Sequence, residues 1–266
     1  MKISHLIEFL HVVAPSELQE DYDNAGLIVG DPNVEIKGVL ICLDALESVV
    51  DEAIQLNCNI IIAHHPIIFK GLKRLNGNTY IERTVIKAIK NDIAIFAIHT
   101  NLDNVIVSGV NTKIAEKLNL KDLSILAPKA NTFHINLPVG AGIIGSLHSS
   151  MSAIDFLQYL KDKMELQSIK HTDLCKSSIS KVALCGGSGG FLLNMAKKQM
   201  ADVFITADFK YHEYFDADKD IIIADIGHYE SEKFTIELLF DLINNNFSNF
   251  AAHCTKVITN PIKYFQ

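Results

Sequence analysis

Apolar runs with the pattern of buried strands alternate with amphipathic stretches in the first half of the chain. From Gly38 onward the strand-like runs are GVLICLD, NIIIAHH and IAIFAIHT, and the helical stretches between and after them are LESVVDEAIQLN, TYIERTVIKAIKND and NTKIAEKLN. Short continuous apolar runs separated by helical periods indicate strands that are buried on both faces. This alternation predicts a mostly parallel sheet covered by helices. Before it, Ile3, Leu6, Ile7 and Leu10 recur at helical spacing and predict an amphipathic first helix.

The alternation breaks around Ala127 and Pro128, where a second lobe is expected to begin. There INLPVGAGIIGSLHS predicts a glycine-bent hairpin or strand pair, and SAIDFLQYLKDKMEL predicts a helix. The runs KVALCGG and VFITAD continue this lobe, and IIIADIGHYES has the form of a buried strand that we expect to return to the first lobe. The predicted fold is therefore α/β with two lobes. Residues 1–125 plus 220–266 form the first lobe from both chain ends, and residues 126–219 form a smaller inserted lobe.

Composition restricts the class of protein. A net charge of -7 disfavours nonspecific binding to nucleic acid, which usually requires a basic surface. The five cysteines are scattered and include no Cys-x-x-Cys pair, which is typical of reduced thiols in a cytoplasmic protein. The first segment lacks the continuous apolar core of a signal peptide, and no apolar run reaches ~18 residues, so no membrane association is expected.

Histidines and carboxylates gather where strand-like runs end. A strand end lies in each of NIIIAHHP, IAIFAIHTNLD and IIIADIGHYESE, and these segments carry His64, His65, His99, Asp103, His228 and Glu232. Ligands of open α/β sheets bind beyond the carboxyl ends of strands, so these side chains are expected to meet in one cleft. A single histidine of this kind is more often a hydrogen-bonded core or surface residue, but three such endings on one edge favour a metal site.

The spacing of His228 and Glu232 supports the same interpretation. They are four residues apart at the start of a predicted helix, so both side chains lie on one face. The alternative explanation for Glu232 is a favourable interaction with the helix dipole, and that for Asp103 is a turn or N-cap role. Three histidines with two carboxylates exceed the three protein ligands of one catalytic zinc and suit two divalent cations. Zinc, manganese, iron, nickel and cobalt all accept such ligands.

Four other features have a candidate role near this site. Asp44 and Asp225 end strands at the same edge and could orient ligating imidazoles. The turn Gly186-Gly187-Ser188-Gly189-Gly190 is either a tight structural turn or an anion site. His212 follows another strand end and is either a proton-transferring residue or a surface histidine.

Several of these segments together resemble the Nif-three-like family, whose members are often labelled GTP cyclohydrolase 1 type 2 homologs. The matching segments are DNAGLIVG, the His-His-Pro, HTNLD, CGGSGG, ITADFKYH and GHYESE, in the family's order over nearly the whole chain. The resemblance implies that two divalent metals are bound by His64, His65, Asp103, His228 and Glu232, with His99 outside the first shell. It also implies a smaller lobe inserted into a larger one, and ring-shaped hexamers built from dimers. The chain departs from the family at Ala207, where glycine is usual.

The function predicted from these features is metal-dependent hydrolysis of a nucleotide or another phosphorylated small molecule. If the family label describes this chain, the substrate is GTP, its imidazole ring opens with release of formate, and His99 or His212 moves protons. Two alternatives stay open. The same kind of site serves phosphoesterases, and a non-catalytic protein that binds or delivers metal, or acts as a regulatory partner, could carry it as well.

Overall fold

The computed structural model describes residues 1–129 and 138–265 and divides the chain into two compact units. The first unit consists of Met1–Leu102 and Thr235–Lys263, and the second of Asp103–Phe234 and Tyr264–Gln266. Both are α/β units with a mixed sheet. Residues Ile135 to Leu137, at the start of the expected hairpin, lie outside the described part.

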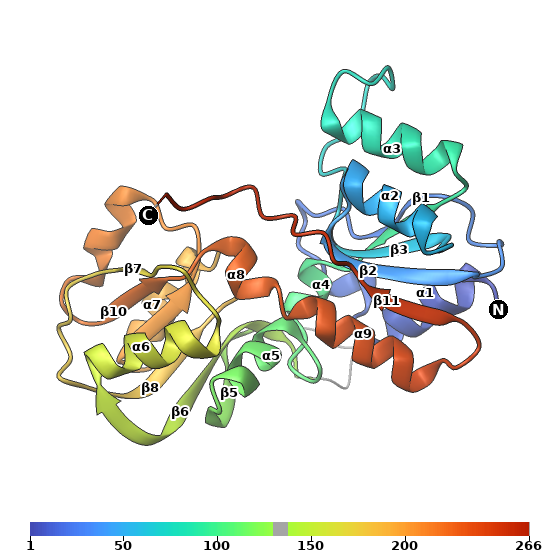
Figure 1. Ribbon diagram of the computed structural model, residues 1–266. Helices are drawn as coiled ribbons and strands as arrows, with labels where there is room; N and C mark the ends of the chain where they lie inside the picture. Colours follow the sequence, from blue (N-terminus) through green and yellow to red (C-terminus); the bar gives the residue numbers. More distant parts are fainter. Residues whose placement is uncertain (130–137, 266) are drawn as a thin grey trace. The chain divides into compact units, whose positions relative to one another are not determined.

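The sheet of the first unit contains strands from both ends of the chain (Figure 1). Its order is β1-β4-β3-β2-β11, with β1 (Gly26–Val29), β2 (Gly38–Asp44), β3 (Ile60–His65), β4 (Ala94–Ala97) and β11 (Ala251–Cys254). The three predicted strands form its parallel centre, β11 adds a further parallel edge, and β1 pairs antiparallel with β4. The sheet is therefore mostly parallel, as expected. Its parallel strands bring their carboxyl ends to one edge, which carries the candidate histidines.

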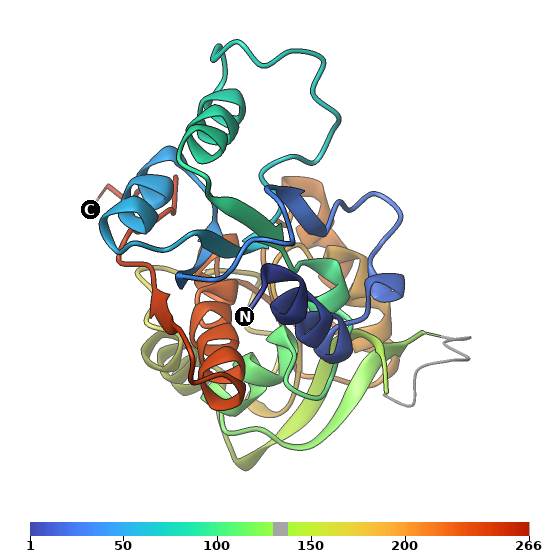
Figure 2. The same ribbon diagram turned by 90° about the vertical axis from the view of Figure 1, so that its right-hand side faces the viewer.

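Helices cover both faces of this sheet. They are α1 (Ile3–Val13), α2 (Glu47–Gln55), α3 (Tyr80–Lys90) and α9 (Thr235–Asn246), with the short η1 (Ser16–Leu18) after α1. Alternate residues along the central strands point to opposite faces. Leu40 and Ile61 therefore pack with Val49 and Val85 beneath α2 and α3, while α1 and α9 lie on the other face (Figures 1 and 2). Buried apolar contacts on both faces fix the strand ends in place.

The second unit has a six-stranded sheet of order β5-β6-β8-β9-β10-β7. The strands are β5 (Lys121–Pro128), β6 (Gly140–Ser152), β7 (Lys170–His171), β8 (Ser178–Leu184), β9 (Val203–Thr206) and β10 (Ile222–Asp225). Its helices are α5 (Val110–Lys117), α6 (Ala153–Lys163), η2 (Gly190–Leu192), α7 (Leu193–Lys198), η3 (Tyr211–Ala217) and α8 (His228–Glu232). The glycine-bent segment forms one long strand, β6, which pairs antiparallel with both β5 and β8.

The chain crosses between the units at other positions than the sequence predicted. The strand IIIAD was expected to return to the first lobe, but β10 pairs in parallel with β9 along its whole length and so belongs to the second sheet. Strand β5 also belongs to that sheet. The crossings fall at 102/103 and 234/235 rather than at 125/126 and 219/220. The apolar character of β10 showed that it would be buried, but not in which sheet.

The predicted helix YESEKFTIELLFDLI forms two helices, α8 and α9, and the chain changes unit between them. The short helix α4 (Thr100–Asp103) ends at the other crossing. Within residues 1–129 and 138–265, every helix is too short or too polar to cross a lipid bilayer.

Candidate metal centre

His64 and His65 end strand β3, and each ring is held by a hydrogen bond at Nδ1. Nδ1 of the buried His64 donates to the carbonyl oxygen of Ile98 at 2.8 Å. Nδ1 of His65 donates to Oδ1 of Asp44, also at 2.8 Å. Asp44 is the register partner of His65 on the neighbouring strand β2, so strand pairing itself places this carboxylate. The proposed orienting role of Asp44 agrees with this contact.

His99, directly after the strand β4, joins the same group. Its ring centroid lies 5.3 Å from that of His64 and 5.2 Å from that of His65, and one ring nitrogen from each of the three lies within 4.8 Å of the others. Nδ1 of His99 donates to Oδ1 of Asp23 at 2.7 Å. The expectation that polar side chains meet where parallel strands end, called the strand-end rule below, is therefore confirmed for three imidazoles of the first unit.

Asp23 was not among the predicted site residues. It begins the family-matching segment DNAGLIVG before strand β1, but nothing in the sequence connects it with His99. Its second oxygen accepts hydrogen bonds from the amide and the hydroxyl of Thr100, at 3.0 Å and 2.5 Å. Burial alone would raise the pKa of Asp23, but the hydrogen bonds from His99 and Thr100 outweigh it and lower the pKa to about 2. Asp23 is therefore a charged acceptor for the His99 ring at neutral pH.

The three rings share one tautomer. A carbonyl oxygen can only accept, so Nδ1 of His64 must carry the proton, and a carboxylate makes the same demand on His65 and His99. This places the lone pair of each neutral ring on Nε2, the atom that can bind a metal or accept a proton. Histidines that bind metal usually donate their other N–H to a carboxylate or a backbone carbonyl in this way. The residues of the first unit therefore fit a metal site.

In the second unit, His228 and Glu232 form a pair on helix α8. Nε2 of His228 lies 3.1 Å from Oε2 of Glu232, as the spacing of four residues predicted. Nδ1 of His228 donates to Oδ2 of Asp208 at 2.7 Å. With its proton at Nδ1, the neutral ring would direct a lone pair at the Glu232 carboxylate. Only a second proton or a cation between the two atoms makes this contact favourable, so this pair also fits a metal.

The glycine turn after β8 is structural. Gly187 has a positive φ of 62°, and a Cβ there would collide with Oε1 of Glu232 and lie 3.3 Å from Cε1 of His228. Its amide donates to Oγ of Ser231 at 2.9 Å. The amides of Gly186 and Gly189 also donate to side chains, those of Asn111 and Thr206. These three N–H groups hold the turn against α8, α5 and the end of β9, so they are already bonded to side chains of the protein.

Asp103 and Glu232 act on the same thiol of the second unit. Burial raises the pKa of Cys185, and the charges of Asp103 and Glu232 raise it further. Cys185 therefore stays protonated and contributes no thiolate to the donor set. The backbone carbonyl of Asp103 accepts a hydrogen bond from Nδ2 of Asn111 at 3.0 Å, which fixes the start of the unit.

Two predicted residues have other surroundings. His212 is exposed on η3, where its ring contacts those of Tyr211 and Phe215. The buried Asp225 accepts from Lys170 at 2.7 Å, from the hydroxyl of Tyr214 at 3.0 Å and from backbone amides, so it fixes the end of β10 and orients no candidate imidazole.

Asp208 takes the role for which Asp225 was considered. It follows β9 by two residues, at the edge where the other strands end, so the strand-end rule could have found it. Ala207, which differs from the family pattern, is buried and lacks a positive φ, and the left-handed position falls on Asp208 with φ 60°. An alanine methyl group is therefore tolerated there.

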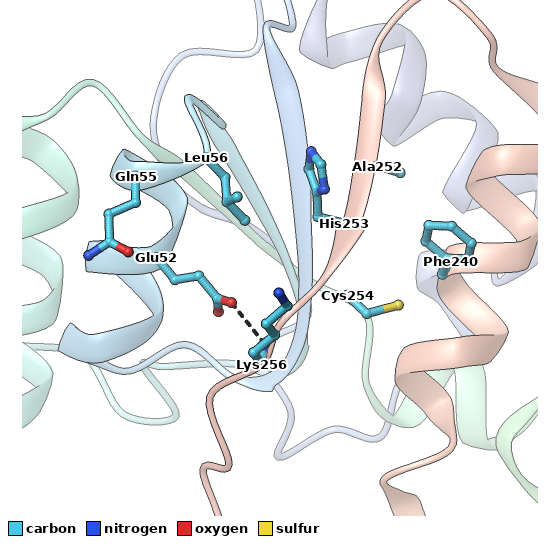
Figure 3. Close-up of a pocket in the computed structure, with 8 residues that line it drawn as sticks. All are labelled: Glu52, Gln55, Leu56, Phe240, Ala252, His253, Cys254 and Lys256. Carbon is cyan, nitrogen blue, oxygen red and sulfur yellow. Dashed lines mark hydrogen bonds between the residues drawn. The ribbon is translucent and has the colours of Figure 1, made fainter.

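A separate cavity of about 520 Å³ lies in the first unit beside β11. Glu52, Phe240, His253 and Lys256 are among its lining residues (Figure 3). The Glu52 carboxylate accepts hydrogen bonds from the Lys256 amide, at 2.8 Å, and from the Thr255 hydroxyl. Glu52 thus fixes the segment after β11. None of the predicted site residues lines this cavity.

Known proteins resemble the chain over its full length. Residues 1–261 match the family described as Duf34/NIF3 (NGG1p interacting factor 3). A Campylobacter jejuni protein named GTP cyclohydrolase 1 type 2 homolog is 33% identical, with all of both chains covered. The crystal structure of the Staphylococcus aureus hypothetical protein SA1388 is 32% identical, with a TM-score of 0.91 and coverage of 100% of this chain and 99% of the other.

A Bacillus cereus protein related to NIF3 has a TM-score of 0.90 at 25% identity, and 100% of this chain and 99% of that chain are covered. The family match and the full-length relative agree with the resemblance drawn from the short motifs. The protein carries histidines and carboxylates compatible with metal binding, of which His64 and Glu232 are buried. The chain belongs to the Duf34/NIF3 family.

Proposed function

We propose that the protein binds two divalent cations and is a metal-dependent hydrolase of a nucleotide-like substrate. One observation carries the proposal: the imidazoles of His64, His65, His99 and His228 are each held at Nδ1 by an acceptor, which places the lone pair of the neutral ring on Nε2. In our proposal Nε2 binds a metal in His64, His65 and His228 and exchanges a proton in His99. Hydrogen bonds of this kind are expected around a metal, and here they recur at or after the ends of three strands, β3, β4 and β10.

The proposed ligands are His64 and His65 from the first unit and Asp103, His228 and Glu232 from the second. Imidazole and carboxylate donors without thiolate suit zinc, manganese, iron, nickel or cobalt. Two such cations supply Lewis acidity and lower the pKa of a bound water towards neutrality. The family relationship supports this set of five, and it leaves His99 for another role.

We assign proton transfer to His99 rather than to His212. The His99 ring lies beside those of His64 and His65. His212 is instead exposed on η3, where its ring contacts those of Tyr211 and Phe215. The charged Asp23 carboxylate orients the His99 ring and fixes its tautomer, as a carboxylate does for a general base. Asp23 is thus a positioning residue, and His99 is the group that would exchange a proton with the substrate.

Elemental analysis of protein purified without added metal tests the binding proposal. We expect two ions per chain in the wild type and a clear loss in His64→Ala, whereas His253→Ala, a control in the separate cavity, keeps both. For the reaction, the metal-loaded protein is incubated with GTP and formate is measured. Formate release that continues unchanged in His64→Ala would contradict a metal-dependent cyclohydrolase.

The same experiment separates two other functions. Two-metal sites with these donors also hydrolyse phosphoesters, and inorganic phosphate or a monoester would then replace formate as product. Stoichiometric metal without turnover of nucleoside phosphates or phosphodiesters would support a metal-binding or metal-delivery protein.

We also propose, from the family resemblance, that the chain forms a ring-shaped homohexamer. Light scattering coupled to size-exclusion chromatography measures the mass directly. A mass near six chains is expected, and a monomer would contradict the proposal.

A further inference from the structure

A long loop follows the histidine pair directly. Residues 66–79 connect β3 to α3 without regular secondary structure (Figure 2). Loops of this length inside a compact unit are uncommon and usually functional. Both ends are fixed: Nδ2 of Asn24 donates to the carbonyl of Ile68 at 2.6 Å, and the amides of Asn76 and Asn78 donate to the Glu82 carboxylate. The segment between these anchors is held in place but faces solvent.

The exposed part of the loop is strongly basic in an acidic protein. Lys70, Lys73 and Arg74 are all exposed, and the chain contains no aspartate or glutamate between Glu52 and Glu82. Glu82 is buried, and its carboxylate already accepts the loop amides. The loop therefore carries three positive charges without a local counterion.

Neighbouring cations behave differently. Arg83 pairs with Glu47 at 2.8 Å, and Lys87 pairs with Asp51 at 2.6 Å. Among residues 1–129 and 138–265, Lys70, Lys73 and Arg74 form neither an ion pair nor a hydrogen bond. Two cations of helix α3, Arg83 and Lys87, are thus neutralised, whereas the loop before it leaves its three cations available to an anion.

Phe69 connects this loop to the donor histidines. Its ring centroid lies 5.7 Å from that of His99 in an edge-on arrangement, and half of the residue is exposed. Lys70 is the next residue, so the first cation of the loop directly follows a residue that contacts His99. Lysine and arginine bind phosphate by charge-assisted hydrogen bonds, arginine in bidentate fashion.

We propose that Lys70, Lys73 and Arg74 bind the phosphate group of a small phosphorylated substrate. The inference rests on the proposed function for the position of the reacting centre, but the phosphate contact itself does not require turnover. It names the substrate class as a phosphate ester or anhydride and assigns its charged end to the first unit. Positive charge at this place also attracts an anionic ligand to a protein whose net charge is -7.

Calorimetric titration with inorganic pyrophosphate tests the inference on metal-loaded protein. The loop variant Lys70→Gln/Lys73→Gln/Arg74→Gln is compared with a charge-matched control in which three exposed lysines elsewhere are replaced, Lys90→Gln/Lys161→Gln/Lys198→Gln. We expect the loop variant to bind pyrophosphate about tenfold more weakly or worse, and the control to stay within about twofold of the wild type. Metal content should be equal in all three proteins.

Two outcomes overturn the inference: an unchanged affinity in the loop variant, or an equal loss in the control, which would indicate a general effect of net charge. A single-stranded oligonucleotide that binds more tightly than pyrophosphate, and only through the loop, would reassign it to nucleic acid. Absence of metal from the wild type would defeat the proposed function, while the loop comparison would still be decided by pyrophosphate.

Discussion

Asp208 holds His228 through a hydrogen bond of 2.7 Å between Oδ2 and Nδ1. Asp44 and Asp23 do the same for His65 and His99. Three carboxylates from different loops and strands therefore perform one task, which is to fix a tautomer and the direction of a ring. The repetition of this contact in both units is stronger support for metal chemistry than the presence of the histidines.

Replacement of Asp208 by asparagine should weaken metal binding while the unit stays folded. The amide oxygen can still accept a hydrogen bond from His228, but the charge-assisted part of that contact is lost. We expect a decrease of about 10- to 100-fold in affinity, measured by competition with a chromogenic chelator. Asp220→Asn, which removes only an ion pair with Lys197 at 2.9 Å, is the control. Equal affinities in both variants would show that the contact is incidental.

Gly187→Ala should disturb the His228 and Glu232 pair without unfolding the protein. The added methyl group would collide with Oε1 of Glu232, and the positive φ adds backbone strain of about 1 kcal/mol or more. Gly77→Ala is the matched control, because Gly77 also has a positive φ of 83° but only Arg83 within 4 Å of its Cβ. We expect loss of metal in Gly187→Ala alone, measured by elemental analysis. If both variants lost metal, the cause would be backbone strain rather than the collision with Glu232.

Asp23 should contribute to stability in a defined acidic window. Its pKa is lowered from 3.8 to about 2 in the folded protein, so the folded state favours the charged form. The contribution is complete above pH 3.8 and is lost as the pH falls towards 2. Urea unfolding at several pH values should therefore show a flatter acid dependence in Asp23→Asn than in the wild type. The exposed Asp216→Asn should keep the wild-type slope, and an unchanged slope in Asp23→Asn would contradict the assignment.

Tyr214 should contribute at the opposite end of the pH scale. Burial and the neighbouring Asp225 raise the pKa of its phenol, so the folded state retains a proton that the unfolded chain releases above pH ~10. This stability is present below pH ~10 and is lost as the pH rises further. Tyr214→Phe should lose about 0.5 to 1.5 kcal/mol at neutral pH with the hydrogen bond to Asp225, and should show a weaker alkaline dependence.

Tyr211→Phe is the control for this change, since Tyr211 lies on the same helix but is exposed. If both variants follow the same alkaline curve, the phenol of Tyr214 is not the titrating group.

Most of the first unit could be predicted because its signals are local. Apolar runs such as that of β3 show where strands lie, and the end of a run shows where a histidine is placed. The spacing of His228 and Glu232 on one helix face needed only the helical period. Short edge strands such as β11 carry no comparable signal, and the sheet that β10 joins depends on contacts between distant segments.

Orienting residues were harder to predict for the same reason. Asp44 lies in a recognisable strand and was found. Asp23 lies 76 positions before His99 in an irregular loop, and only the folded chain brings them together. Asp225 satisfied the strand-end rule but faces Lys170 and Tyr214 instead. The rule identifies an edge of a sheet and does not say which way each carboxylate points.

The pairing of β11 with β2 has a consequence for synthesis of the chain. Ala251 lies beside Gly38, so the edge of the first sheet is closed by a segment that is synthesised more than 200 residues after its partner strand. All strands of the second sheet are synthesised before β11, although chains usually fold from the N-terminus onward. Until β11 arrives, β2 presents an open edge of buried apolar residues, a form of strand prone to aggregation. A nonsense mutation shortly before Ala251 would spare every proposed metal ligand, and its product would be lost to aggregation rather than to a missing ligand.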